Sequence, residues 1–270
     1  MKSQVVVVSG AAGRMGRHLT KCLLEMGYRV AALDLDVSPL TALVEAHPSA
    51  LRCQTVDVRS PAQVQRAIRT VLAEWGKIDI LVNNSAVAVL GAIEEKPLDQ
   101  IRREFELNYF GYLHLIRAVL PFMKARGFGI IHNVSSDLGL TGLSELSSYT
   151  STRGAMESLT TTLRHELRTF GVAVTLMRTP PMRPIWADRL GIPFHTMADP
   201  EDVARKLARR VLSTSAVVGT WDTTEALWSR MTGVLSQLTT RLQGTPSERA
   251  LPGPRPQGRM TESRWPVWNP

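Results

Sequence analysis

Four residues of this chain have side chains and spacings that could support acid–base chemistry. Tyr149 and Arg153 lie four residues apart, and residues at that spacing share one face of a helix. A positive charge beside a phenol favours the phenolate form. Ser136 lies thirteen residues before Tyr149, at the end of an apolar run, and Asn108 lies in an earlier helical segment. The four side chains offer a charge-stabilised phenol, a hydroxyl and an amide.

Residues 9–16 form a glycine-rich turn between an apolar run at 4–9 and a helical pattern at 15–26. Glycines let backbone amides approach a pyrophosphate, and the N-terminus of the following helix favours its negative charge. A tight turn without a ligand is the simpler alternative, but the strand–turn–helix context favours nucleotide binding. The residues expected to hold the nucleotide are Gly10, Gly13, Arg14, Met15 and Gly16.

Asp34 ends the second apolar run, 24 residues after Gly10. A carboxylate at this position can accept hydrogen bonds from the adenosine ribose hydroxyls, and it repels a 2′-phosphate. Asp34 therefore predicts NAD as the cofactor. Arg14 is the opposing signal, because its side chain could reach a 2′-phosphate from the glycine turn, so NADP stays as the less favoured alternative.

The elements that must position these residues alternate along the chain. Continuous apolar runs are separated by amphipathic segments, a pattern typical of a parallel sheet covered on both faces. It predicts a doubly wound α/β fold. The expected strands are 4–9, 29–33, 51–58, 78–82, 129–134 and 172–177; the expected helices are 15–26, 61–75, 98–126 (broken by Pro121), 148–170 and 199–212.

The end of the chain has a different composition. Residues 225–242 have the pattern of an amphipathic terminal helix. Six prolines fall within the 28 residues from 243 to 270, with glycine and arginine between them, so this tail is expected to be disordered. The predicted organisation is a single domain over 1–242, with 180–198 as a lid over the substrate.

The composition excludes several classes of protein. The net charge of +8 could suggest nucleic acid, but the basic residues are spread along the chain without aromatic interleaving, so no nucleic-acid partner is expected. Cys22 and Cys53 lack metal-binding spacing, and no metal is expected. The apolar run at the start is too short for a signal peptide or a membrane span. We expect a cytoplasmic protein without a transmembrane segment.

Asn, Ser, Tyr and a cation at these separations resemble the catalytic set of the short-chain dehydrogenases/reductases. Two further motifs strengthen the resemblance, which covers residues 4 to about 212. Asp57 and Val58 match the family's adenine-contacting pair. Residues 83–86, Asn-Asn-Ser-Ala, match the family's Asn-Asn-Ala-Gly motif with its last two positions altered, and they add Asn84 to the expected cofactor site.

The resemblance implies a Rossmann-type doubly wound sheet and a role for each catalytic residue. Tyr149 would be the general acid or base for a carbonyl or alcohol oxygen, and Ser136 would hold that oxygen. Asn108 would order a water on the proton path. The family cation stabilises the phenolate, binds the nicotinamide ribose and passes on protons; here that position is Arg153.

Several positions depart from the family pattern. Arginine replaces lysine at Arg153, and a guanidinium keeps the charge but does not release a proton. Thr179-Pro180 stands where the family has Pro-Gly. Classical members have glycines at the positions of Gly10, Arg14 and Gly16, whereas this chain has Gly13 in place of a glycine at position 14. The closing strand with a Val-Asp-Gly-Gly signature is missing. Proline cannot adopt the glycine geometry or donate an N–H.

The sequence predicts an NAD-dependent oxidoreductase that interconverts a secondary alcohol and a ketone. Two alternatives stay open: a non-redox enzyme of the same fold (dehydratase, cyclase or isomerase), and a catalytically weakened nucleotide-binding protein. Aromatic residues in 180–198 suggest a small, partly apolar substrate. By resemblance, the helices 98–126 and 148–170 would form the face of a homodimer, which could pair into a homotetramer.

Overall fold

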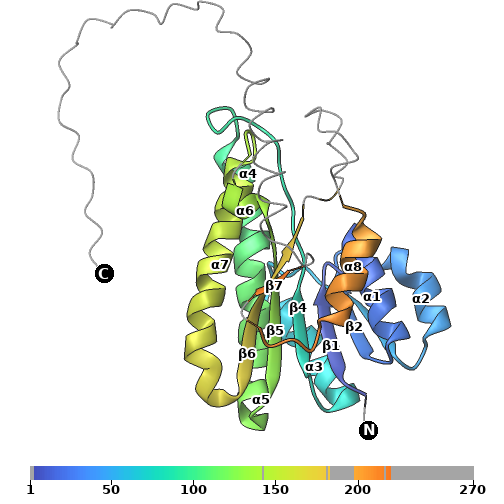
Figure 1. Cartoon of the computed structure of the whole chain (residues 1–270). Coiled ribbons are helices and arrows are strands. Elements are labelled where there is room, and N and C mark those ends of the chain that lie inside the picture. Colours follow the sequence, from blue (N-terminus) through green and yellow to red (C-terminus); the bar gives the residue numbers. More distant parts are fainter. Residues whose placement is uncertain (1–2, 142, 181, 183–197, 216, 220–270) are drawn as a thin grey trace, which may run out of the picture. The chain divides into compact units, whose positions relative to one another are not determined.

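A parallel sheet organises the computed structural model, which describes residues 3–141, 143–180, 182, 198–215 and 217–219 (Figure 1). The described strands pair in the order β3-β2-β1-β4-β5-β6-β7, all parallel. They are β1 Val5–Ser9, β2 Arg29–Asp34, β3 Leu51–Thr55, β4 Ile80–Asn83, β5 Gly129–Ser136, β6 Val172–Thr179 and β7 Val217–Gly219. The predicted α/β fold with a doubly wound sheet is confirmed.

The strand β7 corrects one expectation. Val217–Gly219 pairs with β6 and closes the sheet, although the family signature for a closing strand is missing from the sequence. Backbone hydrogen bonds form the pairing, so a short strand can form without that signature.

Both faces of the sheet are buried, which explains the continuously apolar strands. Along β1, Val6 and Val8 pack into one core cluster, and Val5 and Val7 pack into the other. Alternate side chains of a strand point to opposite faces, so one run of four valines supplies both cores. Helices α1 and α8 contribute to the first cluster, and α3 and α5 contribute to the second.

Eight α-helices are present among the described residues: α1 Arg14–Glu25, α2 Thr41–Ala46, α3 Pro61–Trp75, α4 Leu98–Phe105, α5 Gly111–Arg126, α6 Leu138–Thr141, α7 Ser147–Leu167 and α8 Pro200–Arg209. Ser60 caps α3 by accepting a hydrogen bond from the Gln63 amide, and Asp199 caps α8 in the same way through the Glu201 amide. The described helices include none that is long and apolar enough to cross a bilayer.

The expected helix 98–126 is helical throughout, with a π-helical turn within it and no break at the proline. A π-turn at Glu106–Phe110 separates α4 from α5, and α5 continues through Pro121 to Arg126. The π-turn carries Asn108. The lid at 180–198, apart from residues 180, 182 and 198, lies outside the described residues, as do the terminal helix at 225–242 and the tail at 243–270.

The strand order positions the site. After β1 the chain crosses to β2 on one side and later to β4 on the other, so the connections diverge between β1 and β4. Ligands of such sheets bind at the carboxyl ends of the strands at this switch point. The final residues of β1 to β6 at this edge are all polar: Ser9, Asp34, Thr55, Asn83, Ser136 and Thr179.

Candidate active site

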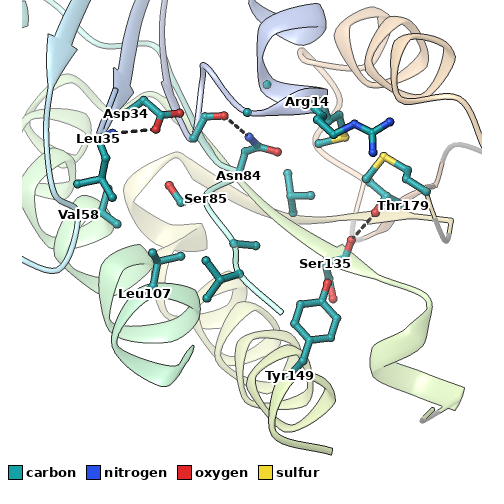
Figure 2. Close-up of a pocket in the computed structure, with 18 of the residues that line it drawn as sticks. Arg14, Asp34, Leu35, Val58, Asn84, Ser85, Leu107, Ser135, Tyr149 and Thr179 are labelled. Carbon is teal, nitrogen blue, oxygen red and sulfur yellow. Dashed lines mark hydrogen bonds between the residues drawn. The ribbon is translucent and has the colours of Figure 1, made fainter. Parts of the chain in front are cut away.

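A cavity of about 350 Å³ opens at the switch point (Figure 2). One part is lined by the glycine turn, Asp34, Asp57 and Val58, and another by Tyr149, Arg153 and Thr179. The structure therefore brings the two sequence-predicted sites into one cavity. The predicted cofactor residues that line it are Gly10, Gly13, Arg14, Met15, Gly16, Asp34, Asp57, Val58, Asn84 and Arg153.

The space available for a Cβ atom differs among the three glycines of the turn. Gly10 has a φ of 63°, and a Cβ there would lie 2.8 Å from Ser85 Cα. A Cβ on Gly16 would lie 1.9 Å from the Gly10 carbonyl oxygen. Gly13 has a φ of −63°, and a Cβ there would lie 3.3 Å from the Gly10 carbonyl oxygen, the nearest atom. The fold requires Gly10 and Gly16, whereas Gly13 keeps the cavity open in front of α1.

Asn84 holds the glycine turn in place. Its Nδ2 donates to the carbonyl oxygens of Ser9 at 3.1 Å and Gly10 at 2.9 Å. The Ser9 hydroxyl in turn accepts from the backbone amides of Asn84 at 3.0 Å and Ser85 at 3.2 Å. These bonds join the ends of β1 and β4, so Asn84 shapes the cavity as well as lining it.

Two carboxylates lie at the end of the cavity formed by β2 and β3. Asp34 accepts hydrogen bonds from the backbone amides of Ala12 and Leu35, both at 2.8 Å, which fixes its carboxylate beside the glycine turn. Asp57 is paired with Arg59, at 2.9 Å to Nε and 2.6 Å to Nη2. The bonds from Arg59 hold the pKa of Asp57 below its usual value.

Arg153 is buried beside Tyr149 on α7, with a relative exposure of 2%. Its Cζ lies 4.9 Å from the centre of the Tyr149 ring. Its Nη1 donates to the Val134 carbonyl oxygen at 3.0 Å, whereas Nε and Nη2 are buried without a hydrogen-bond partner among the described residues. Burial opposes the charged form, but the phenols of Tyr149 and Tyr112 outweigh it and raise the pKa of Arg153.

The end of β5 differs in detail from the prediction. Ser136 is buried, its hydroxyl accepts a hydrogen bond from the Leu138 amide at 3.3 Å, and it is not among the described residues that line the cavity. The neighbouring Ser135 lines it, and Figure 2 shows the Tyr149 side chain pointing from α7 toward Ser135. The Ser135 hydroxyl donates to Glu157 Oε1 at 2.9 Å, and its carbonyl accepts from the Thr179 hydroxyl at 3.0 Å.

Asn108 lies behind the cavity rather than in its lining. Its Nδ2 donates to the Val87 carbonyl at 2.9 Å and to Thr152 Oγ1 at 3.1 Å, and its Oδ1 accepts from the Val87 amide at 2.9 Å. Thr152 Oγ1 donates to the Tyr149 carbonyl at 2.6 Å. Asn108 therefore connects the segment that follows β4 to the helical turn that carries Tyr149.

A buried charged network next to this turn was missed by the sequence analysis. Lys96 Nζ lies 2.7 Å from Ser148 Oγ and 3.7 Å from Glu104 Oε2, and both charged side chains are almost fully buried. Ser148 donates to Glu104, Lys96 donates to the Val89 carbonyl, and Glu104 Oε1 accepts from the Val89 amide at 2.7 Å. No motif in the sequence singles out these residues.

Residues 4–187 of the chain match the family model described as short chain dehydrogenase. The chain belongs to the short-chain dehydrogenase family. The chain is 28% identical over 182 residues to VdlC of Helicobacter pylori, a probable short-chain type dehydrogenase/reductase, covering 67% of this chain and 66% of the relative. It is 34% identical over 182 residues to YusZ of Bacillus subtilis, an uncharacterized oxidoreductase, covering 66% and 64%. Slightly less than two-thirds of either relative's length is matched.

Solved structures agree with the fold. A short-chain dehydrogenase from Streptomyces avermitilis has a TM-score of 0.72 and 28% identity, covering 88% of this chain and 96% of its own. Two structures with lower identity share the fold: an NAD⁺-bound xylitol dehydrogenase (TM-score 0.73, 23% identity, 80% and 96% covered) and ElxO with NADP bound (0.72, 18%, 84% and 99%).

Proposed function

We propose that this short-chain dehydrogenase interconverts a secondary alcohol and a ketone with NAD(H), on a small and partly apolar substrate. The observation that carries the proposal is the guanidinium of Arg153, buried against the Tyr149 ring within the cavity at the switch point. The guanidinium places a fixed positive charge beside the phenol. The pair fits a tyrosine that exchanges a proton with a substrate oxygen.

The residues present fit a dinucleotide. The pyrophosphate would lie against the turn from Gly10 to Gly16, at the N-terminus of α1, where the helix dipole favours negative charge. Asp34 would accept hydrogen bonds from the adenosine ribose, with Asp57 and Val58 beside the adenine. The two unpartnered nitrogens of Arg153 are donors suited to the nicotinamide ribose. When bound, the cofactor supplies or accepts the hydride.

The protein's own residues then divide the remaining work. Tyr149 gives a proton to a ketone oxygen or takes one from an alcohol, and Ser136 or its neighbour Ser135 holds that oxygen. Arg153 contributes a fixed charge, because a guanidinium stays protonated in proteins. Proton transfer beyond Tyr149 must therefore pass through hydroxyl groups rather than through Arg153. Asn108 positions the turn that carries Tyr149.

The preference for NAD over NADP rests on Asp34. Its carboxylate is held beside the glycine turn by the amides of Ala12 and Leu35, so it cannot easily move away from a 2′-phosphate. Arg14 also lines the cavity and is the group that would favour NADP.

A second candidate function is nucleotide binding with little or no turnover. Arg153 and the Thr179-Pro180 sequence favour it, since the first removes a proton-releasing lysine and the second changes the backbone that follows β6. The cavity and the cofactor residues are the same in both cases.

Nucleotide titration followed by a substrate screen separates these functions. We expect the purified protein to bind NADH more tightly than NADPH, measured by nucleotide fluorescence, and to reduce NAD with at least one secondary alcohol, measured by nicotinamide absorbance. Binding without turnover across the screen would favour the second function. A tenfold preference for NADPH, about 1.4 kcal/mol, would show that Arg14 outweighs Asp34.

A further inference from the structure

Tyr112 is a second tyrosine beside Arg153, and it belongs to none of the cofactor or catalytic motifs of the sequence. It belongs to the first turn of α5 and is fully buried. Its hydroxyl donates to the Val134 carbonyl oxygen at 3.3 Å. Burial raises the pKa of Tyr112, so this phenol stays a neutral donor.

Arg153 is held at the same point. Its Nη1 donates to the Val134 carbonyl at 3.0 Å and approaches the Tyr112 hydroxyl oxygen at 3.5 Å. One carbonyl at the end of β5 thus accepts from both side chains. The Tyr112 ring centre lies 6.0 Å from Arg153 Cζ and the Tyr149 ring centre 4.9 Å, so the guanidinium is close to two tyrosine rings.

The hydrogen bond from Nη1 to the Val134 carbonyl oxygen fixes one side of the planar guanidinium group of Arg153. A guanidinium is planar, and Nε and Nη2 present their hydrogens along one edge as a fork, whereas Nη1 lies at the other corner. With Nη1 held, the plane cannot turn freely about its long axis. The fork of Nε and Nη2 is the part without a partner among the described residues.

Gly139 leaves room for the stem of the same side chain. A Cβ on Gly139 would lie 2.7 Å from Arg153 Cβ. Any larger residue there would displace the arginine stem and, with it, the fork.

We propose that Tyr112 is a positioning residue that adapts this site to an arginine. Together with the Val134 carbonyl it holds Nη1, so that Nε and Nη2 donate as a pair to the two hydroxyls of the nicotinamide ribose. The proposal rests on the proposed cofactor. It also predicts that Tyr112 affects NADH affinity only when residue 153 is an arginine, because a lysine ammonium has a single nitrogen and no separate Nη1 for Tyr112 to contact.

A double-mutant cycle on nucleotide affinity tests this inference without using turnover. The variants are Tyr112→Phe, Arg153→Lys and the double variant, and the probes are NADH and ADP, which lacks the nicotinamide ribose. We expect Tyr112→Phe to weaken NADH binding about 5- to 10-fold, because a less firmly held guanidinium forms weaker hydrogen bonds to the ribose, and to leave ADP binding unchanged. In the Arg153→Lys background the same change should have no effect on NADH.

The control is Tyr28→Phe, which removes a hydroxyl from another largely buried tyrosine, outside the cavity lining. Equal weakening of NADH and ADP by Tyr112→Phe, or equal effects in both backgrounds, would show a general structural role and overturn the inference. Unchanged NADH affinity in Tyr112→Phe would also overturn it. Failure of the native protein to bind either nucleotide would instead refute the proposed function, and the inference with it.

Discussion

Arg153 decides what kind of catalysis this cavity can support. The guanidinium is buried, charged and stacked on the ring of Tyr149, so the electrostatic part of the family lysine's work is retained. The part that requires proton release is lost, because a guanidinium does not deprotonate. On the proposed function, Arg153 keeps the positive charge beside Tyr149 but cannot take the lysine's step in the proton path.

We predict that Arg153→Lys raises kcat severalfold, since an ammonium at this position can pass on a proton. The KM for NAD should rise at the same time, because the paired Nε and Nη2 donors are lost. Steady-state kinetics with the best alcohol from the screen measure both quantities. Complete loss of activity in Arg153→Lys would show that the guanidinium itself is the working group, as in the non-redox alternative.

The glycine turn provides a matched pair of variants. Gly13→Ala adds a methyl group 3.3 Å from the Gly10 carbonyl oxygen, a tight contact that a shift of a few tenths of an ångström relieves, so folding should be affected less than by Gly16→Ala while NADH affinity falls at least tenfold, about 1.4 kcal/mol. Gly16→Ala would place the methyl 1.9 Å from the Gly10 oxygen and should destabilise the fold itself. Thermal unfolding and nucleotide titration distinguish the two. Normal NADH binding by Gly13→Ala would place the pyrophosphate elsewhere.

At the scale of elements, His132 connects the centre of the sheet to the end of α8. It is fully buried in β5, and its Nε2 lies 2.7 Å from the Val211 carbonyl oxygen, while Nδ1 is paired with Thr175 Oγ1. The Val211 carbonyl can only accept, so Nε2 carries the proton of a neutral imidazole. Burial lowers the pKa of His132 to about 4.

This pKa predicts acid sensitivity. His132 of the unfolded chain binds a proton at about pH 6.5, whereas buried His132 of the folded chain binds one only near pH 4. The free energy of unfolding is therefore unaffected by this group above the unfolded pKa, and it decreases as pH falls from about 6.5 to about 4. The loss should reach about 3 kcal/mol. Urea unfolding at several pH values measures it. His132→Gln should remove this part of the pH dependence; an identical pH profile in that variant would contradict the assignment.

Much of the arrangement of elements follows from the sequence, because a buried parallel strand must be apolar on both faces. Val5–Val8 shows this directly, and strand ends such as Asp34 could be placed from the same pattern. The π-turn at Asn108 could not be predicted, since one extra residue in a helix leaves the surrounding periodicity nearly unchanged.

The finer features of the site escaped the sequence for similar physical reasons. Lys96 and Glu104 are charged residues, which are almost always exposed, and only the fold shows that they neutralise each other in the interior. Ser135 and Ser136 are adjacent hydroxyls at the end of one strand, and a difference of one residue decides which faces the cavity. Tyr112 lies in no motif and is brought to Arg153 by packing alone.

For the whole molecule, we predict a homodimer formed by α4, α5 and α7. Large apolar side chains are exposed on this part of the chain, among them Leu98, Phe110 and Phe122. Burial of such side chains against a second copy would be favourable. Light scattering at micromolar concentration should give the mass of two chains, and Phe122→Glu should shift it toward one. A monomer for the native protein would contradict the prediction.

The central claim is that Tyr149 performs proton transfer in a cavity that binds NAD(H). Its most direct test is Tyr149→Phe, compared with the native protein for both NADH affinity and turnover of a secondary alcohol. We predict that the native protein reduces NAD and that Tyr149→Phe does not, while the NADH dissociation constants agree within about twofold, roughly 0.4 kcal/mol. Undiminished turnover in Tyr149→Phe would contradict the account.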